Sequence, residues 1–261
     1  MIESRRNETV KAIRRLRRRQ GDEVLLEGPH LVSEALAAGL SLGSVLVTPA
    51  FAASPAGRDL GRRLARAPVE VSEAVLAELA DADSPRGAIA VARLPRPRAG
   101  GVAAEGLHLY LDGLQDPGNL GAVARVAEAF STVALWLGEG CAHPNHPRAL
   151  RASAGSLLRL PAFRGATVEN LGRALAGRGA RWIGLEAHGG GPLPRRSPAG
   201  TLVVALGAEG RGLSPEVTQR LDERWTIPLA TPVESLNVAV AAGIVLHALR
   251  SPGVRRGASS A

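Results

Sequence analysis

The chain of 261 residues contains one cysteine, one lysine and no apolar run long enough to cross a membrane. The single cysteine, Cys141, excludes an intrachain disulfide bond. The apolar run near the end, residues 238–249, is shorter than the roughly 20 residues that a membrane-spanning helix needs. The first residues are charged and lack the apolar segment of a signal peptide. These absences predict a cytoplasmic protein without a membrane partner.

The sequence also lacks a dinucleotide-binding fingerprint and a metal-ligand pattern. The glycines of residues 207–212 stand in the reverse of the fingerprint order, and the acidic residue lies inside the loop. This difference excludes a nicotinamide enzyme. Cys141, His143 and His146 share a loop that contains two prolines, and no second Cys/His pair accompanies them. We therefore expect loop residues there rather than zinc ligands, and no metal site.

Positive charge is in excess, with 32 Lys and Arg against 24 Asp and Glu, a formal net charge of +8 and a pI of about 11.2. Such an excess favours a polyanionic partner. Residues 5–19 are rich in arginine, and their apolar residues recur at helical spacing, which predicts a basic helix with a narrow apolar stripe. A solvated surface helix is the alternative. The candidate contacts to RNA phosphates on this helix are Arg14, Arg15 and Arg18.

In the first 94 residues, short apolar strands alternate with helices. Strands are predicted at residues 23–27, 45–47, 69–71 and 89–93. Helices are predicted from Pro29 to before Gly39, from Pro55, and from a serine cap at Ser72. This alternation predicts a small α/β domain. Residues 95–105 are rich in proline and glycine and lack periodicity, so they are predicted to be a linker.

The second half continues the alternation over a longer stretch. Strands are predicted at residues 107–111, 133–137, 182–185, 201–206 and 225–228, and helices at residues 121–130 and 168–176 and after Ser214. Because ligand sites in open α/β sheets collect at the carboxyl ends of strands, residues 112–119 are a candidate site. Residues 189–191 are predicted to be a flexible surface loop, and residues 251–261 a disordered tail.

An apolar helix is predicted at residues 238–249, after a loop that contains Pro228 and Pro232. Ser235 suits the helix cap, which would place Asn237 inside the first turn, beside free backbone N–H groups that can hold a polar ligand. A helix that is apolar all round is buried in a core or in an interface. Taken alone, this stretch also fits an ordinary capped core helix.

Three stretches of the second half carry motifs in a fixed order. The first reads Asn-x-Gly-x-x-x-Arg at Asn119, Gly121 and Arg125, and the second reads Gly-x-Glu-Gly-x-Gly-Leu at residues 207–213. The third reads Ile-Pro at residues 227–228 and Glu-Ser-Leu-Asn at residues 234–237. In order and spacing they resemble the motifs of the SpoU-type RNA ribose methyltransferases of the SPOUT superfamily. Residues 27–36 more weakly resemble the substrate-binding domain that often precedes that catalytic domain.

The resemblance implies an α/β fold in two domains. Residues 1–94 would be a small N-terminal α/β domain that binds the RNA substrate, and residues 95–105 the linker. Residues 106–250 would be a C-terminal α/β SPOUT domain with a deep trefoil knot. The family forms homodimers through this domain. Knots are rare, so this expectation rests on the resemblance alone.

The implied function is S-adenosylmethionine-dependent methylation of a ribose 2′-hydroxyl in ribosomal or transfer RNA. The residues that match the family's cofactor loops are Gly207, Glu209, Gly210, Ile227, Pro228, Leu236 and Asn237. The candidate catalytic residues are Arg125, Asn119, Glu209, Ser235 and Asn237. A non-catalytic RNA-binding or ribosome-assembly protein with the same fold is the alternative, but the motif residues are intact.

Each candidate residue has an expected role. Arg125 would grip an RNA phosphate and orient the adjacent ribose, because a guanidinium stays protonated and suits positioning better than proton abstraction. Asn119 and Ser235 would orient the hydroxyl or that arginine. Glu209 would hold Arg125 or Asn119, and Asn237 would fix the cofactor loop.

Overall fold

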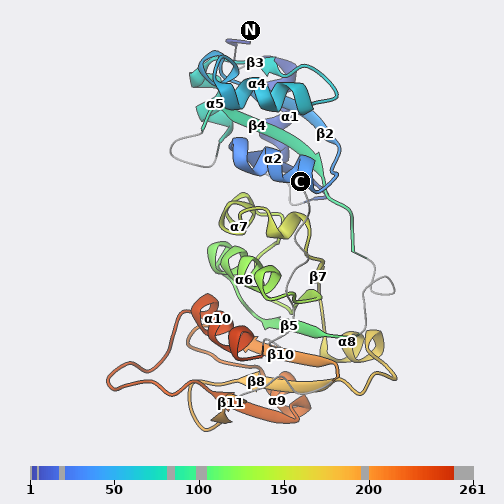
Figure 1. The fold of residues 1–261 in the computed structure, drawn as a ribbon, viewed down its shortest axis with the longest axis vertical. Coiled ribbons are helices and arrows are strands. Elements are labelled where there is room, and N and C mark those ends of the chain that lie inside the picture. Colours follow the sequence, from blue (N-terminus) through green and yellow to red (C-terminus); the bar gives the residue numbers. More distant parts are fainter. Residues whose placement is uncertain are drawn as a thin grey trace.

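The computed structural model describes residues 2–4, 6–17, 21–80, 86–97, 105–194 and 200–249. Within these ranges the strands form two separate sheets, one of four strands and one of seven. We call the part built on the first sheet (residues 2–97) the N-terminal unit and the part built on the second (residues 105–249) the C-terminal unit. Figure 1 shows the N-terminal unit, in blue to teal, above the C-terminal unit.

The sheet of the N-terminal unit is mixed, with the spatial order β1-β4-β2-β3. Its strands are β1 (Glu23–Glu27), β2 (Leu42–Val47), β3 (Val69–Glu70) and β4 (Ala88–Arg93). Strand β4 runs antiparallel to β1 and β2, whereas β3 runs parallel to β2. Because successive side chains of a strand point to opposite faces, the sheet has two apolar faces that each need a cover.

Helices cover both faces of this sheet. They are α1 (Glu8–Arg17), α2 (Pro29–Ala37), α3 (Pro49–Ala52), α4 (Pro55–Arg63) and α5 (Glu73–Leu79). Helices α1 and α5 pack on one face, where Val10 and Ile13 of α1 are buried, which confirms the predicted apolar stripe. Helices α2 and α4 pack on the other face, and α2 lies toward the C-terminal unit (Figure 1).

The sheet of the C-terminal unit is parallel throughout, with the order β7-β6-β5-β10-β8-β11-β9. Its strands are β5 (Leu107–Asp112), β6 (Ala134–Leu137), β7 (Ala162–Arg164), β8 (Arg181–Leu185), β9 (Gly191–Pro192), β10 (Leu202–Gly207) and β11 (Glu223–Thr226). Strand β10 lies between β5 and β8, with Gly207 beside Asp112. The order of the strands therefore changes direction at β5 and β10, and such a switch point is where open α/β sheets bind ligands.

The helices of this unit are α6 (Pro117–Ala129), α7 (Pro147–Ala152), the 3-10 helix η2 (Ser156–Leu158), α8 (Val168–Ala174), α9 (Pro215–Arg220) and α10 (Val238–Ala248). Helices α6 and α10 pack together on one face of the sheet, and α8 and α9 cover the other (Figure 1). Helix α7 can lie close to α6 because Gly121 has no side chain. A Cβ atom there would come within 2.7 Å of the Ala152 Cβ atom. None of the helices in the described ranges is long and apolar enough to cross a membrane.

The predicted α/β alternation is confirmed, with local corrections. Helix α6 begins at Pro117, four residues before the predicted start, because Asp116 caps it and proline fits its first turn. Residues 189–191 were predicted to be a loop, but Gly191 begins the short strand β9, which pairs with β11. Strands β7 and β9 and helix α3 were missed because segments of two to four residues carry too little periodicity. The trefoil knot stays a prediction.

Candidate active site

Helix α6 places Asn119 at the carboxyl edge of the sheet. The Asp116 carboxylate caps this helix and accepts a hydrogen bond of 2.8 Å from the Asn119 backbone N–H group. The other Asp116 oxygen lies 3.1 Å from Nη1 of Arg148, which is exposed on α7. Asn119 therefore sits inside the first helical turn, where the helix geometry holds its side chain, rather than before the helix predicted at residues 121–130.

The second motif forms a tight loop directly after β10. Ala208 and Gly212 form an isolated bridge, and the Gly212 N–H group donates to the Ala208 carbonyl oxygen at 3.0 Å. A side chain at Gly207 would overlap the Gly212 backbone, so only glycine fits there. Gly210 has a φ of 82° and Gly212 a φ of 67°, which glycine adopts without strain. The result is an exposed loop that turns Glu209 toward α6.

Three side chains, one from each motif, form a hydrogen-bonded cluster. Asn119 Nδ2 donates to Glu209 Oε1 at 2.9 Å. Asn237 Nδ2 donates to Asn119 Oδ1 at 2.9 Å and to Glu209 Oε1 at 3.4 Å. These residues are 90 and 118 positions apart in the chain, so only the fold can bring them together. We call Asn119, Glu209 and Asn237 the polar triad.

The start of α10 differs from the prediction. Asn237, not Ser235, is the N-cap residue, and its Oδ1 accepts a hydrogen bond of 3.0 Å from the Ala239 N–H group. Asn237 thus uses its oxygen for the cap and its Nδ2 group for the triad. The sequence prediction placed the cap at Ser235. Serine and asparagine are about equally good caps, so residue type alone does not distinguish Ser235 from Asn237. Ser235 is exposed in the preceding loop.

A pocket of about 510 Å³ opens beside the triad. Its walls come from the ends of β8 and β10, from the loop after β11 and from the first turns of α10. The predicted residues among its lining are Gly207, Glu209, Gly210, Ile227, Ser235 and Leu236. Pro228 and Asn237 do not line it, although their immediate neighbours do. Most of the predicted cofactor loops therefore meet around one cavity.

Part of this lining was not among the residues predicted from the sequence. Residues 185–188 line the pocket, as do Leu229 and Glu234. Residues 185–188 follow the carboxyl end of β8, next to β10 in the parallel sheet. The rule that ligands bind at the carboxyl ends of parallel strands identifies them as well, because a strand is predicted at residues 182–185.

Arg125 stands apart from the triad. It is exposed on α6, and it makes no hydrogen bond or ion pair with any residue in the described ranges. It lies six positions after Asn119, so the two side chains point in directions about 120° apart on a helix of 3.6 residues per turn. The expectation that Glu209 holds either Arg125 or Asn119 resolves in favour of Asn119. The Arg125 guanidinium is free to meet a partner outside the chain.

The loop before α7 uses its Cys and His side chains for structure. The Cys141 thiol donates to the Leu111 carbonyl oxygen at 3.1 Å, and burial raises its pKa. His143 is buried and accepts a hydrogen bond of 3.0 Å at Nδ1 from the Asn145 N–H group. Burial, with Arg164 and His146 nearby, lowers the pKa of His143 to about 4, so it is neutral at pH 7. His146 caps α7.

The basic helix α1 is partly committed to internal contacts. Arg14 forms an ion pair with Glu78, and Lys11 pairs with Glu8 at 2.7 Å. Arg15 is exposed, and Arg18 lies outside the described residues. Since α1 covers the sheet face opposite to α2, it lies on the far side of the N-terminal unit from the C-terminal unit (Figure 1).

Two family models match the chain. One, described as the SpoU rRNA methylase family, matches residues 106–247, which include the triad and the pocket. The other, described as an MRM3-like substrate binding domain, matches residues 7–90. Together they cover most of both units.

Curated relatives extend over nearly the whole chain. A tRNA/rRNA methyltransferase of Synechocystis is 35% identical over 262 residues, which cover 95% of this chain and 93% of the relative. The 23S rRNA (guanosine(2553)-2′-O)-methyltransferase RlmP of Bacillus subtilis is 30% identical over 253 residues, which cover 95% of this chain and 98% of RlmP. Among solved structures, the SpoU methyltransferase AviRb of Streptomyces viridochromogenes in complex with AdoMet has a TM-score of 0.83 at 26% identity, over 93% of this chain and 97% of AviRb.

Proposed function

Since this chain belongs to the SpoU rRNA methylase family, we propose that it is an S-adenosylmethionine-dependent methyltransferase for a ribose 2′-hydroxyl of ribosomal or transfer RNA. The observation that carries this proposal is the polar triad. It joins the three motifs at the mouth of a pocket of about 510 Å³, within the size range of small-molecule sites. AviRb, which has the same fold, was solved with AdoMet.

The pocket fits S-adenosylmethionine in shape and chemistry. Gly207 and Gly210 line the cavity and carry no side chain, so backbone groups there can approach a purine and a ribose closely. Ile227, Leu229 and Leu236 supply apolar walls. Glu186 and Glu234 also line the pocket, and an acidic side chain suits a cationic sulfonium, although the Glu186 carboxylate lies 3.7 Å from Nε of Arg224. When bound, S-adenosylmethionine would supply an electrophilic methyl group on a cationic sulfur, for which a ribose oxygen of the RNA is the acceptor.

The triad holds the reaction site in shape. Glu209 accepts hydrogen bonds from two amide groups, which fixes the loop of the second motif against α6 and α10. Asn237 anchors the start of α10 to that loop, and Leu236, the residue before it, lies against the pocket. Ser235 lines the pocket and is exposed, so its hydroxyl can orient the ribose. Asn119 ties the start of α6 to the same loop and to α10.

Arg125 binds RNA. Its guanidinium is exposed and has no partner in the described ranges, and a guanidinium can grip a phosphate through two parallel hydrogen bonds. That grip orients the adjacent ribose and stabilises negative charge as the 2′-hydroxyl loses its proton. Arg14, Arg15 and Arg18 would add phosphate contacts, although Arg14 is already paired with Glu78.

A homodimer through the C-terminal unit completes the proposal. One face of α10 is buried, but Val240 and Ile244, four residues apart, are 52% and 38% exposed. An apolar strip on a surface helix is typical of an interface. Light scattering at micromolar concentration should give the mass of a dimer, and Val240→Glu with Ile244→Glu should give a monomer. A monomeric wild-type mass would refute the dimer.

The proposal divides the chain into an RNA-binding domain (residues 1–94), a linker (residues 95–105) and a methyltransferase domain (residues 106–250), followed by a tail (residues 251–261). Its place is the cytoplasm, where ribosomal and transfer RNA are modified. Parts of the linker and the whole tail lie outside the described residues.

The decisive experiment combines cofactor binding with methyl transfer. Calorimetry should show S-adenosylmethionine or its demethylated product binding to the purified chain. Transfer of a tritiated methyl group to total RNA from a strain that lacks the protein should then yield alkali-resistant dinucleotides, which report ribose methylation. Binding of NADH but of neither methyl-cycle compound would refute the assignment. Cofactor binding without transfer to any RNA would favour a non-catalytic RNA-binding protein.

A further inference from the structure

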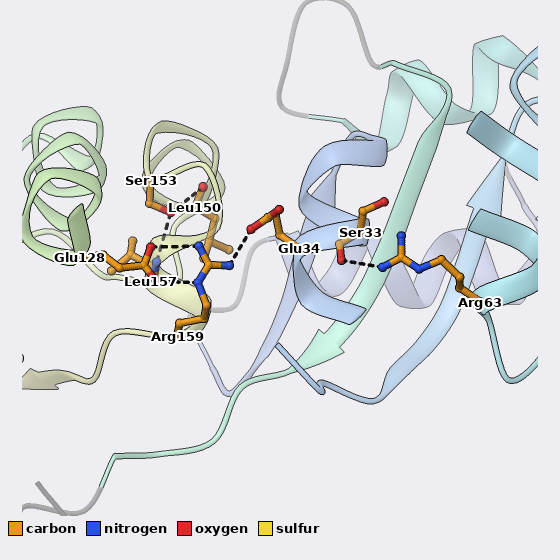
Figure 2. Close-up of polar contacts among 8 residues, drawn as sticks. All are labelled: Ser33, Glu34, Arg63, Glu128, Leu150, Ser153, Leu157 and Arg159. Atoms are coloured by element: carbon orange, nitrogen blue, oxygen red, sulfur yellow. Dashed lines mark hydrogen bonds and ion pairs between the residues drawn. The ribbon is translucent and has the colours of Figure 1, made fainter. Parts of the chain in front are cut away.

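An arginine of the C-terminal unit bridges the two units. Arg159, which follows η2, donates from Nε and Nη2 to the two carboxylate oxygens of Glu128 on α6, at 2.6 and 3.0 Å. Its Nη1 group donates to Glu34 Oε2 on α2 of the N-terminal unit, at 2.6 Å. Figure 2 shows the guanidinium between the two carboxylates. We call Glu34, Arg159 and Glu128 the clamp.

The clamp is stronger than an ordinary surface ion pair. Each of its three side chains is about two-thirds buried. The Glu128 and Glu34 carboxylates, in that order, raise the pKa of Arg159, so the guanidinium is charged throughout the working pH range. A bidentate arginine–carboxylate pair also defines an orientation, because the planar guanidinium donates two parallel hydrogen bonds to the carboxylate in one geometry.

A second ion pair lies in the same interface. Glu27, at the end of β1, has a side chain only 2% exposed, and its Oε2 lies 2.7 Å from Nη1 of Arg151 on α7. A buried charge that loses its partner costs several kcal/mol, so this contact disfavours separation of the units. Nearby, Asn145 Nδ2 donates to the Gly21 carbonyl oxygen at 2.8 Å. Gly155 leaves room for Glu34, because a Cβ atom there would come within 2.9 Å of the Glu34 side chain.

The apolar core also crosses the interface. One continuous cluster of buried residues includes Leu26 and Leu31 of the N-terminal unit and Leu157 and Leu158 of the C-terminal unit. Shared burial and two ion pairs together oppose free rotation of the N-terminal unit. The units are therefore docked in one orientation, rather than only tethered by residues 95–105.

The clamp ends on the helix that carries the candidate catalytic residues. Glu128 is three residues after Arg125 on α6, about one helical turn, and Asn119 lies in the first turn of the same helix. Helix α2 of the N-terminal unit is thus fixed to α6 through one guanidinium. RNA held by the N-terminal unit is then at a set distance from Arg125.

We propose that Arg159 is a positioning residue for methyl transfer, which acts through Glu34 to hold the RNA-binding unit in register with α6. This inference rests on the proposed function. A displacement of about 1 Å at a reacting centre can cost up to about 100-fold in rate, so the loss of register should appear in kcat. RNA affinity should not fall, because the RNA-binding surface of the N-terminal unit stays intact.

The test compares two charge reversals in the full-length protein, Glu34→Lys and Asp59→Lys. Both replace an acid of the N-terminal unit by a lysine, but among the described residues Asp59 on α4 pairs only with Arg62 and Arg63 of its own helix. Each variant gains two positive charges, so each should bind RNA at least as tightly as wild type. At saturating RNA, Glu34→Lys should lower kcat about tenfold or more, whereas Asp59→Lys should keep the wild-type kcat.

Milder changes separate positioning from stability. Glu34→Gln removes one charge without repulsion and should lower kcat less than Glu34→Lys, while the amount of bound S-adenosylmethionine per chain stays at the wild-type value. In the Glu34→Gln background, Arg159→Lys should cost less kcat than it does in wild type, because the two residues act through one contact. A purely structural role would lower the melting temperature but leave the kcat of the folded fraction unchanged.

Equal kcat in Glu34→Lys and Asp59→Lys, with active wild-type protein, would overturn the positioning role alone. Wild-type protein that binds S-adenosylmethionine and methylates no RNA would instead overturn the proposed function, and the positioning role with it. Hydrogen exchange gives a readout that needs no activity: the amides of residues 156–160 should exchange faster in Glu34→Lys than in Asp59→Lys. Equal exchange rates would refute the clamp as a structural contact.

Discussion

The two units use the same alternation of strands and helices but arrange their strands differently. In the N-terminal unit the sheet is mixed, so the carboxyl ends of β4 and of its two neighbours lie at opposite edges. In the C-terminal unit all seven strands are parallel, and all their carboxyl ends meet at one edge. A parallel sheet therefore collects the loops of distant segments at one place, which a mixed sheet does not.

This difference decides how each unit can work. At the edge of the C-terminal sheet where the carboxyl ends meet, the loops after β5, β8, β10 and β11 build the triad and the pocket. The N-terminal unit presents helices on both faces, and its charged side chains lie on those helices or in the interface. The C-terminal unit is thus suited to enclosing a small molecule and the N-terminal unit to contacting a large one. Four experiments test this contrast, from the largest expected effect to the smallest.

Gly207→Ala should abolish S-adenosylmethionine binding. The new methyl group would overlap the Gly212 backbone, which cannot move without opening the loop that carries Glu209. Calorimetry measures the loss. Gly172→Ala is the matched control, because Gly172 lies in α8 with open space around its Cα atom; it should keep full affinity and gain about 0.5–1 kcal/mol of helix stability. Normal binding by Gly207→Ala would mean that S-adenosylmethionine does not bind in the pocket at the carboxyl edge of the parallel sheet.

Arg125→Ala should keep its fold and its affinity for S-adenosylmethionine but lose methyl transfer by about 100-fold or more. The fold should not change because Arg125 is exposed. The affinity for S-adenosylmethionine should not change because Arg125 does not line the pocket. Arg125→Lys should restore little, since lysine cannot form two parallel hydrogen bonds to a phosphate. Tritiated methyl transfer measures both variants. Full activity in Arg125→Ala would remove this residue from the mechanism.

Acid should loosen the loop that contacts the N-terminal unit. The folded-state pKa of His143 is about 4, below the ordinary value of 6.5, so the unfolded chain binds a proton more readily between these values. The free energy of unfolding is therefore intact above pH 6.5 and should fall as the pH drops to about 4. Denaturant unfolding of wild type and His143→Asn, which keeps an acceptor for the Asn145 N–H group, isolates this contribution. Identical pH profiles would refute it.

Arg15→Ala should weaken RNA binding only a few-fold at low salt and reduce the salt dependence of binding by about one phosphate contact. The effect is small because one exposed cation contributes one contact. Arg173→Ala, on α8 of the C-terminal unit, is the control, since its side chain is 73% exposed and lies in a weak pair with Glu169. Filter binding over a range of salt concentrations measures both variants. An equal loss in the two variants would mean that α1 is an ordinary solvated helix.

Much of the fold could be predicted because its signals are local. Proline after a serine cap predicted the starts of α4 and α9, and both serines do cap their helices. Apolar periodicity predicted α1, and Val10 and Ile13 are buried as expected. The cap of α10 could not be predicted, because two good capping residues stand two positions apart and only the contact of Asn237 with Asn119 selects one.

The candidate site could be predicted in its residues but not in its contacts. Motif order identified the loops that meet around the pocket. It did not show that Glu209 binds Asn119 rather than Arg125, because that choice depends on the direction in which each side chain leaves α6. The clamp carried no sequence signal at all, since Glu34, Glu128 and Arg159 are isolated charges in a chain with many.

By itself the sequence determined the order of strands and helices, the three motifs and the excess of positive charge, because propensity, periodicity and composition act over a few residues. Only the tertiary structure decided that Asn119, Glu209 and Asn237 share hydrogen bonds, that Arg125 stays free, and that Arg159 joins the units. Those contacts connect residues 28 to 125 positions apart in the chain or depend on the rotation of a helix. They exist only once burial of the apolar core has set the distances between strands and helices.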